Sequence, residues 1–341
     1  MLLLAASALA QEAPPIVNGQ RDNGNYKAVG ALVSLKNNYG GGFCSGTLVH
    51  QKYVITAAHC VYPAQEYKQQ GYDIYWVSSD DIYDGTWARY AEVANMWANP
   101  GYNDNSQSIN DDIGVLELKT TIDNWPTQAI NKNSPLNSWM GRPVTYVGFG
   151  VTRENADDSG IRRWVNVPLE GADADFLYTY SGDSGQVKNI CSGDSGGAAL
   201  MEFDNEMVLV GANSFTTNWN GGSTDCDAAG AAGASTRTDA FWNWITTYIP
   251  ENELNQGNTG GGDADTDSDS DSDTDSDADG DSDSDADTDI WDSGFIDTGD
   301  PDRPPRGLEE PDTGVLPGCS TAPITGGLLL GLLAVLRRRS R

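Results

Sequence analysis

The sequence predicts an all-β protein, a barrel or sandwich built from two similar halves. Short β-rich runs bounded by Gly and Asn dominate residues 16–250, and many of them alternate apolar with polar side chains. A polar break at residues 120–128 divides these runs into two similar groups. The runs lie at residues 28–35, 46–59, 73–79, 113–118, 144–150, 162–169, 196–203 and 207–215.

The first residues are typical of an export signal rather than of a folded element. Residues 1–10 form an apolar run that ends on Ala8-Leu9-Ala10, a small-residue pattern found at signal-peptide cleavage sites. The run is short and has no basic beginning. We therefore expect a shortened signal peptide at 1–10, with its true start upstream, followed by a short propeptide at 11–15.

One helix is predicted at the end of the β-rich region. Residues 238–250 begin with Thr and Asp as candidate N-caps and end at a proline. Helical spacing gives this segment an apolar face made of Phe241, Trp244, Ile245 and Tyr248.

An acidic linker is expected at residues 251–317. Asp occupies every odd position from 263 to 289, and the residues between them are Ala, Ser, Thr and one Gly. Such a segment has no apolar surface to bury, and its like charges repel one another. We predict a disordered, extended stalk.

A calcium site is the alternative interpretation of the same linker. Asp275, Asp277, Asp279 and Gly280 match the opening of an EF-hand loop. The twelfth position of that loop is Ala286, however, where an EF-hand carries Glu, and the flanking sequence is not helical in character. The pattern favours a solvated spacer.

The last residues, 318–341, form a three-part tail. Cys319 is followed by an apolar stretch of 14 residues, 323–336, and then by an Arg cluster. The stretch is shorter than the roughly 20 residues that span a bilayer. The tail resembles the MYXO-CTERM class of bacterial C-terminal sorting signals, and the alternative is an ordinary tail anchor oriented by its basic flank. Both predict a secreted protein held at the bacterial cell surface through a membrane-associated tail.

Charge and cysteine content restrict the function classes. Residues 16–250 carry 26 acidic side chains against 14 Lys and Arg. A net negative surface argues against nucleic acid as a partner, because phosphate binding needs clustered basic side chains. Export implies an oxidising compartment, and Cys319 belongs to the tail. Four cysteines therefore remain for two disulfides: Cys44, Cys60, Cys191 and Cys226.

Candidate catalytic side chains come from three separate stretches. Any histidine base must be His59, which ends an apolar run, or His50, which lies in a polar turn where a solvated imidazole is expected. Asp112 directly precedes an alternating apolar run, a position from which a carboxylate can be buried and aimed. Gly-Asp-Ser-Gly occurs twice, at Ser184 and Ser195, and the tetrapeptide is also typical of turn-forming loops. The tetrapeptide by itself does not choose between the two serines.

The order of these motifs carries a family resemblance. The stretches IVNG, CSGTLV, TAAHC, DDIGVL, GDSGG and NSF follow one another along residues 16–250. In this order the chain resembles the chymotrypsin-like, trypsin-fold serine proteases. The resemblance implies two six-stranded antiparallel β-barrels with a C-terminal helix, a monomeric protease domain, and protein or peptide substrates. We expect neither a cofactor nor a metal, because the alternative of a calcium loop around Asp73 to Asp84 is not supported by any clear spacing.

The resemblance also implies a role for each candidate catalytic residue. Ser195 attacks the scissile carbonyl, His59 takes and later returns the proton, and Asp112 holds the imidazole in the useful tautomer. The backbone N–H groups of Gly193 and Ser195 bind the oxyanion that forms during the attack.

The disulfides implied by the resemblance select between the two serines. A Cys191–Cys226 bridge ties the turn that contains Ser195, four residues after Cys191, whereas Ser184 has no such tether. The second bridge, Cys44–Cys60, closes a short loop beside the catalytic histidine. Ser195 is therefore the expected nucleophile.

Activation and specificity are further expectations from the resemblance. Cleavage before Ile16 frees an α-amine that pairs with Asp194, although Pro15 stands where related zymogens carry Arg or Lys. Asn189 occupies the base of the specificity pocket, where a carboxylate would select basic side chains. A neutral residue is therefore expected at P1, the substrate position before the cut bond. The remaining substrate-binding positions implied by the resemblance are Ser214, Phe215, Thr216 and Gly233.

Two alternatives come from other function classes. A catalytically silent, protease-like binding module is disfavoured because all three residues of the triad are present. A cation-binding surface polymer, with the protease merely carried along, would place the function in the acidic linker.

Overall fold

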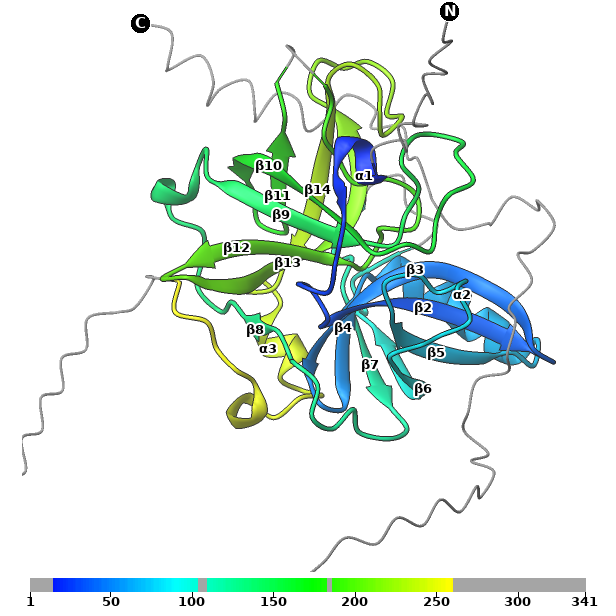
Figure 1. Ribbon diagram of the computed structural model, residues 1–341. Helices are drawn as coiled ribbons and strands as arrows, with labels where there is room; N and C mark the ends of the chain where they lie inside the picture. The colour runs from blue at the N-terminus through cyan, green and yellow to red at the C-terminus, as the bar shows by residue number, and fades with distance from the viewer. Residues whose placement is uncertain (1–14, 104–108, 183–185, 260–341) are drawn as a thin grey trace, which may run out of the picture. The chain divides into compact units, whose positions relative to one another are not determined.

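The N-terminal half folds into a closed six-stranded antiparallel barrel. The structure is a computed structural model that describes residues 15–103, 109–182 and 186–259. Neighbouring strands follow the order β2-β3-β4-β7-β6-β5, and this barrel forms the blue and cyan part of Figure 1. Its strands are β2 (Val29–Lys36), β3 (Tyr39–His50), β4 (Tyr53–Thr56), β5 (Asp73–Ser78), β6 (Arg89–Ala98) and β7 (Gly114–Leu118).

The C-terminal half repeats this architecture. Six strands follow the order β10-β11-β14-β13-β12-β9, and a further pairing of β9 with β10 closes the ring. The strands are β9 (Pro143–Gly148), β10 (Arg163–Ala172), β11 (Phe176–Tyr180), β12 (Ala198–Phe203), β13 (Glu206–Asn218) and β14 (Ala231–Arg237). The predicted pair of six-stranded barrels is confirmed.

Two short strands extend the second barrel. β1 (Gln20–Arg21) pairs with β10, and β8 (Ala129–Ile130) runs parallel to β13. β8 follows the polar break at 120–128, so the connection between the barrels lies where the sequence places it.

Two tight hairpins show how the sequence sets the register. Asn37 and Asn38 join β2 to β3 with φ values of 53° and 71°, and Asp204 and Asn205 join β12 to β13 with values of 50° and 65°. Two-residue hairpin loops with positive φ at both positions match the twist of the strands, and Asn and Asp tolerate this backbone region well.

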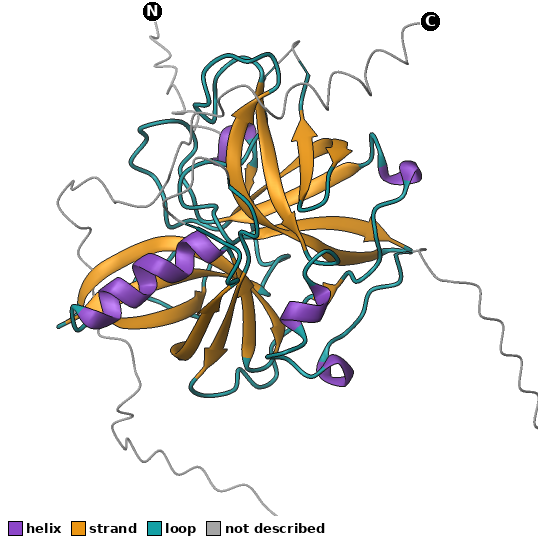
Figure 2. Cartoon of the chain, turned by 180° about the vertical axis from the view of Figure 1, so that it is seen from behind, coloured by secondary structure: helices purple, strands orange, loops and turns teal. Residues whose placement is uncertain are grey.

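The described chain contains a helix that the sequence did not predict. α2 (Ala58–Gln69) follows β4 directly, whereas residues 46–59 were expected to be a single β-rich run. The predicted C-terminal helix is present but shorter than residues 238–250, since α3 covers only Trp242–Ile245. Both helices are visible from behind in Figure 2. Ile245 of α3 is fully buried in a core that also contains side chains of both barrels.

The ordered domain continues beyond residue 250, where we expected the acidic linker to begin. After the short 3₁₀ turn η2 (Glu251–Glu253), the Ile130 amide donates to the Asn255 carbonyl at 2.8 Å. The buried Thr259 hydroxyl donates to the Asn131 side chain at 2.8 Å. We call residues 251–259 the C-terminal strap, because it runs along β8.

The expected signal, propeptide residues before Pro15, remaining linker and C-terminal tail lie outside the described residues. Within the described ranges, the helices are too short or too polar to cross a membrane.

Candidate active site

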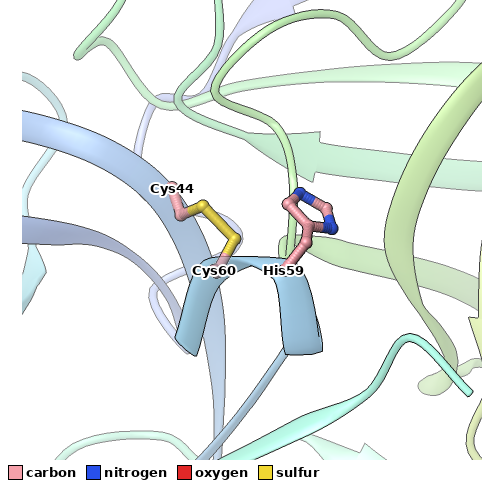
Figure 3. A group of neighbouring side chains, drawn as sticks. All are labelled: Cys44, His59 and Cys60. Carbon is pink, nitrogen blue, oxygen red and sulfur yellow. A yellow bond between two sulfur atoms is a disulfide. The ribbon is translucent and has the colours of Figure 1, made fainter. Parts of the chain in front are cut away.

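His59 lies in the first turn of α2, at the junction between the barrels. β4 ends at Thr56, and the extended conformation of Ala57 turns the chain into the helix. Figure 3 shows the His59 imidazole beside the disulfide between Cys44 and Cys60, whose Cα atoms are 6.1 Å apart. This disulfide, implied by the resemblance, therefore ties β3 to the turn that carries the imidazole.

Asp112 faces His59 from the segment just before β7, which begins at Gly114. Its Oδ2 lies 2.8 Å from His59 Nδ1, and its Oδ1 accepts the His59 backbone N–H at 2.9 Å. The approach depends on Gly114, because a Cβ there would lie 2.7 Å from the Val61 side chain and 3.1 Å from the Ala57 carbonyl. The carboxylate thus fixes both the backbone and the ring of His59.

The Asp112 carboxyl is fully buried and yet stays ionised at neutral pH. Burial by itself raises its pKa, but the nearby His59 and the hydrogen bonds from His59 and Ser214 outweigh that effect. The pKa of Asp112 therefore lies below its ordinary value. A negative charge is held where it can orient an imidazole and stabilise its protonated form.

Ser214 reaches Asp112 because of a β-bulge. The register of β13 against β14 shifts between Asn213 and Phe215, so Ser214 is the extra residue at this point. A bulge re-aims a side chain, and the Ser214 hydroxyl donates to Asp112 Oδ2 at 2.5 Å. The resemblance implied a place for the Ser214 strand beside the substrate backbone, which stays a prediction, and the structure adds a hydrogen bond from the Ser214 hydroxyl to the carboxylate.

Ser195 lies in a tight turn that contacts β3, β4 and the first turn of α2. Its carbonyl accepts the Ser45 N–H at 2.8 Å and lies 3.5 Å from the Sγ of Cys60. Cys60 directly follows His59 in the sequence. Gly196, with φ of 75°, lies so close to β4 that a Cβ would clash with the side chain of Thr56. The turn therefore places Ser195 beside the first turn of α2.

Of the two competing residues, His50 is among the described ones. His50 is the last residue of β3, and its Nε2 is 3.4 Å from a carboxylate oxygen of Glu253. Ser184, in the other Gly-Asp-Ser-Gly copy, lies outside the described residues.

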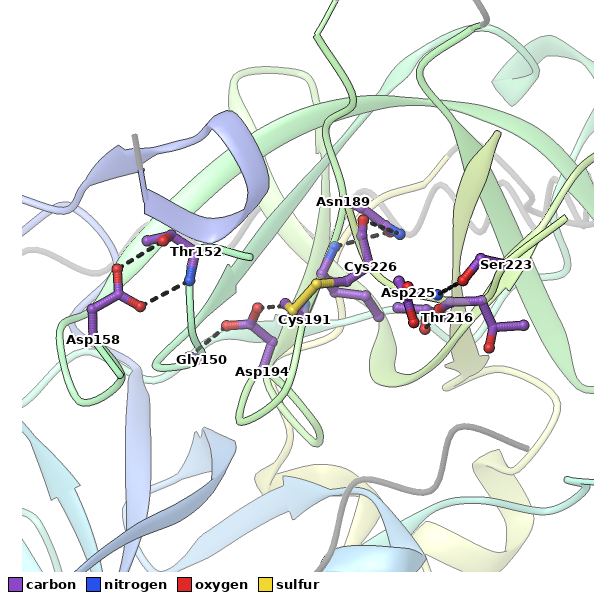
Figure 4. Close-up of a disulfide and its surroundings, with 12 residues drawn as sticks. Gly150, Thr152, Asp158, Asn189, Cys191, Asp194, Thr216, Ser223, Asp225 and Cys226 are labelled. Carbon is purple, nitrogen blue, oxygen red and sulfur yellow. Dashed lines mark hydrogen bonds between the residues drawn. A yellow bond between two sulfur atoms is a disulfide. The ribbon is translucent and has the colours of Figure 1, made fainter. Parts of the chain in front are cut away.

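A buried carboxylate stabilises the turn before Ser195 by accepting backbone hydrogen bonds. Asp194 accepts the N–H groups of Gly150 and Cys191, each at 2.8 Å, as Figure 4 shows. The Cys191–Cys226 disulfide, also implied by the resemblance, closes beside it. Gly193 adopts a φ of 92°, and a Cβ there would lie 2.9 Å from Gly150 Cα. The backbone of the turn is therefore fixed from several sides.

Asp194 has an unusual protonation equilibrium in this intact chain. Burial raises its pKa to about 7, although the N–H groups of Cys191 and Gly150 and the charge of Arg163 act in the opposite direction. Its negative form therefore lacks a sufficient counter-charge.

Ile16 is buried near this turn. Its side chain is fully enclosed among residues that include Tyr146 and Ile190, and Val17 forms an isolated bridge with Asn189. With Pro15 still attached, Ile16 has a φ of 37°. Positive φ is strained for a β-branched residue.

Of the expected pocket residues, Gly233 lies directly against Asn189, and Thr216 pairs with Gly233 across β13 and β14. Asn189 is fully buried, and its amide donates to the Cys226 carbonyl at 3.3 Å. A Cβ at Gly233 would lie 2.7 Å from Asn189 Oδ1 and 2.9 Å from the Tyr146 hydroxyl, so these three residues are in close contact. The Thr216 hydroxyl donates to the Thr224 carbonyl at 2.8 Å.

The loop around Cys226 carries two carboxylates. Asp225 and Asp227, which flank Cys226, have exposed side chains. Phe215 packs edge-on against Phe176, with ring centroids 5.1 Å apart.

Metal ligands do not assemble at this site. In the described part of the chain, the two groups of three possible ligands are Cys44, His59 and Cys60, and Glu154, Cys191 and Cys226. Each group contains both sulfurs of a disulfide, which cannot act as thiolate ligands.

Three residues of the site were not identified from the sequence. The Thr236 hydroxyl donates a hydrogen bond to the Asp112 carbonyl at 2.7 Å. The Tyr146 hydroxyl lies close to Gly233, and Ser45 contacts the turn that contains Ser195. Ser45 stands in the CSGTLV stretch, but no feature of the sequence marks Thr236 or Tyr146 as part of a site.

Comparison with known proteins agrees with this geometry. Residues 16–245 match the family model described as Trypsin. The chain is 28% identical over 227 residues to a trypsin of Saccharopolyspora erythraea, an alignment that covers 64% of this chain and 91% of that protein. It is 26% identical over 222 residues to chymotrypsin-like elastase family member 1 of Bos taurus, with 61% and 79% covered. With more than half of its residues matched by the family model, the chain belongs to the trypsin family of serine-type endopeptidases.

Proposed function

We propose that the chain is a secreted, surface-anchored endopeptidase that cleaves peptide bonds with Ser195, His59 and Asp112. The main support is the buried Asp112 carboxylate, which contacts both the ring and the backbone of His59 beside the Ser195 turn. Members of this family act on proteins or peptides, so a polypeptide is the substrate.

The proposed chemistry follows from what each group can donate or accept. Ser195 Oγ attacks the scissile carbonyl carbon, and its proton passes to the Nε2 of His59. Asp112 keeps the proton of His59 on Nδ1 and offsets the positive charge of the imidazolium. The amine leaves with the proton from His59, and water then cleaves the acyl-enzyme by the reverse sequence. The N–H groups of Gly193 and Ser195 stabilise the oxyanion in both halves.

Activation is proposed to require a new N-terminus at Ile16. In the intact chain Ile16 has a strained φ, and Asp194 is buried with a raised pKa. Cleavage after Pro15 removes the restraint on Ile16 and frees an α-amine that pairs with the carboxylate. A trypsin-like activator does not fit a Pro-Ile bond, so we propose signal processing followed by trimming of residues 11–15.

The P1 preference is proposed to be neutral and small to medium in size. Asn189 replaces a carboxylate and already donates to a backbone carbonyl, and the buried Tyr146 hydroxyl lies close to Gly233. A basic P1 side chain would enter this region without a charge partner.

Export and anchoring are supported by the chain ends and by the cysteines. Two disulfides suit an oxidising compartment, and residues 1–10 and 318–341 have the composition of a signal and a sorting tail. Fractionation of the native organism, with the domain detected by antibody, tests this part of the proposal. A protein confined to the cytoplasm would reject it.

Hydrolysis of fluorogenic peptide amides tests the catalytic proposal. The chain is produced behind a removable leader so that Ile16 becomes its first residue. We expect turnover by this form, its loss in Ser195→Ala and His59→Ala, and its retention in the matched control His50→Ala. A panel that differs only at P1 should show faster cleavage after Ala, Val or Leu than after Arg.

Other results would contradict parts of this proposal. Undiminished turnover in Ser195→Ala would assign the chemistry to another residue, and rapid cleavage after Arg would overturn the P1 preference. A folded chain that cleaves no member of the panel would favour the binding-module alternative.

A further inference from the structure

Ser45 joins the first barrel to the turn that carries the oxyanion donors. It lies on β3 with its side chain fully buried. Its backbone N–H donates to the Ser195 carbonyl at 2.8 Å, and its hydroxyl donates to the Gly193 carbonyl at 2.8 Å. One residue of the first barrel therefore contacts both residues whose N–H groups are assigned to the oxyanion.

The direction of the Ser45 hydroxyl is set by its partners. The Gly193 carbonyl can only accept a hydrogen bond, so Ser45 must donate its proton there. The Phe149 N–H can only donate, and it donates to Ser45 Oγ at 3.1 Å. The hydroxyl is thus fixed between two backbone groups of the second half of the chain.

The two peptide units that flank Gly193 are restrained by different contacts. The unit before it is held because the Ser192 carbonyl accepts the Val151 N–H at 2.9 Å. The unit after it is held by Ser45 on the carbonyl side, and on the other side by the bond from Asp194 N–H to the Cys191 carbonyl at 3.0 Å.

Gly193 needs these restraints because its own backbone is permissive. Glycine populates positive and negative φ almost equally, so the observed φ of 92° does not by itself exclude a rotated peptide. A rotation of the unit before Gly193 would turn its N–H away from the position of the oxyanion.

We propose that Ser45 is a positioning residue for the oxyanion site, acting through its hydroxyl on the Gly193 peptide. This inference rests on the proposed function, in which Gly193 and Ser195 bind the oxyanion. Ser45 does not touch the substrate in this account. It fixes the carbonyl side of Gly193, so that the residue that carries the donor is restrained before the charge develops. Preorganisation of this kind is the condition under which such donors accelerate acyl transfer most.

Ser45→Ala and Ser45→Gly remove the hydroxyl, and Ser45→Thr retains one. The matched control is Thr47→Val, since Thr47 is also buried on β3 and the structure shows no partner for its hydroxyl. Each variant is made in the full chain with a leader that is removed before Ile16.

The readouts separate positioning from stability. Active sites are first titrated with a serine-directed phosphonate, and kcat and KM for a peptide amide are then measured per active site. The inhibition constant of a peptide aldehyde, whose adduct places an oxyanion in the site, is measured alongside.

We expect Ser45→Ala and Ser45→Gly to lower kcat by roughly 10- to 100-fold, below the 10²- to 10³-fold lost with a donor itself. KM should stay within about twofold, and aldehyde affinity should fall in parallel with kcat. Ser45→Thr and Thr47→Val should retain both values.

Unchanged kcat and aldehyde affinity per active site in Ser45→Ala would overturn the inference. A loss confined to the number of titratable sites would do the same, since it would assign the hydroxyl to folding. If Ser45→Ala and Ser45→Gly both fail to fold while Ser45→Thr folds, that also assigns it to folding. Absence of hydrolysis by the parent chain would instead refute the proposed function.

Discussion

Asp112 accepts several hydrogen bonds in a fully buried site. Its contribution to catalysis therefore depends on the charge of the carboxylate as well as on its shape. The amide of Asn has nearly the same size as the carboxylate, but its NH₂ group cannot accept the proton on His59 Nδ1. We expect Asp112→Asn to lower kcat on the order of 10⁴-fold, because the imidazole would be held in the wrong tautomer. Steady-state hydrolysis of a peptide amide measures this, and a loss below tenfold would contradict the assigned role.

Asp194 makes the stability of the intact chain depend on pH. Its pKa is about 7 in the folded chain, against an ordinary 3.8. Between about pH 4 and pH 7 the folded chain holds a proton that the unfolded chain has lost, so the free energy of unfolding falls as the pH rises. The fall is on the order of 4 kcal/mol and levels off above pH 7.

Denaturant unfolding at a series of pH values measures this slope, in a Ser195→Ala background that prevents self-cleavage. Asp194→Asn should remove the slope, whereas Asp225→Asn, at an exposed position, should keep it. Freeing the amine of Ile16 should also reduce the slope, because a positive charge lowers the pKa of the carboxyl. An Asp194→Asn variant with the parental slope would assign the pH dependence to another group.

Residues with distinctive sequence neighbours could be proposed from the sequence, whereas residues whose role depends on the fold could not. His59 is one of only two histidines, and Ser195 has a cysteine four positions before it. Thr236 reaches Asp112 from β14, a strand rich in Ala and Gly whose sequence gives no sign of a site. The role of the Ser214 hydroxyl depends on a bulge, which requires knowledge of the register between β13 and β14.

At the scale of the element, the alternating pattern predicted strands in both halves, whereas the sequence analysis did not single out the tight turns that set their register. Asn37-Asn38 and Asp204-Asn205 are hairpin sequences that fix two strand pairs directly. α2 was missed because residues 46–59 continue the β-rich pattern into its first turn. Its remaining residues have no strong apolar face, so tertiary contacts rather than periodicity hold it.

The C-terminal strap, residues 251–259, is expected to stabilise the domain without taking part in catalysis. It buries Leu254 and Thr259 and continues the hydrogen bonding of β8. A chain that ends at Pro250 should lose about 2 to 3 kcal/mol of unfolding free energy relative to one that ends at Thr259. Urea unfolding measures the difference, and kcat per active site should be equal in the two chains.

Equal stability of these two chains would show that the strap contributes nothing to the fold. A lower kcat per active site in the shorter chain would instead connect the strap to the catalytic residues.

At the scale of the whole molecule, a buried arginine links the two barrels. Arg162, next to β10, donates to Asp22 at 2.6 Å and to Asp80 at 2.5 Å, and it also contacts the Val29 carbonyl and the Ser78 hydroxyl. Asp22 is itself buried, so loss of the cation would leave its charge without that partner.

Arg162→Met is therefore expected to lower the free energy of unfolding by about 3 to 5 kcal/mol. Arg153→Met, at an exposed position on the same half of the chain, should change it by less than about 0.5 kcal/mol. Urea unfolding of both variants tests the link, and equal effects would contradict it.

The whole account depends on Ser195 being the nucleophile that His59 activates. The most direct test is labelling of the chain with a peptidyl phosphonate, followed by mass spectrometry of the tagged peptide. We predict a single tag on Ser195 in the form that begins at Ile16, and no tag in His59→Ala. A tag on Ser184, or equal labelling of Ser195 without His59, would contradict the account.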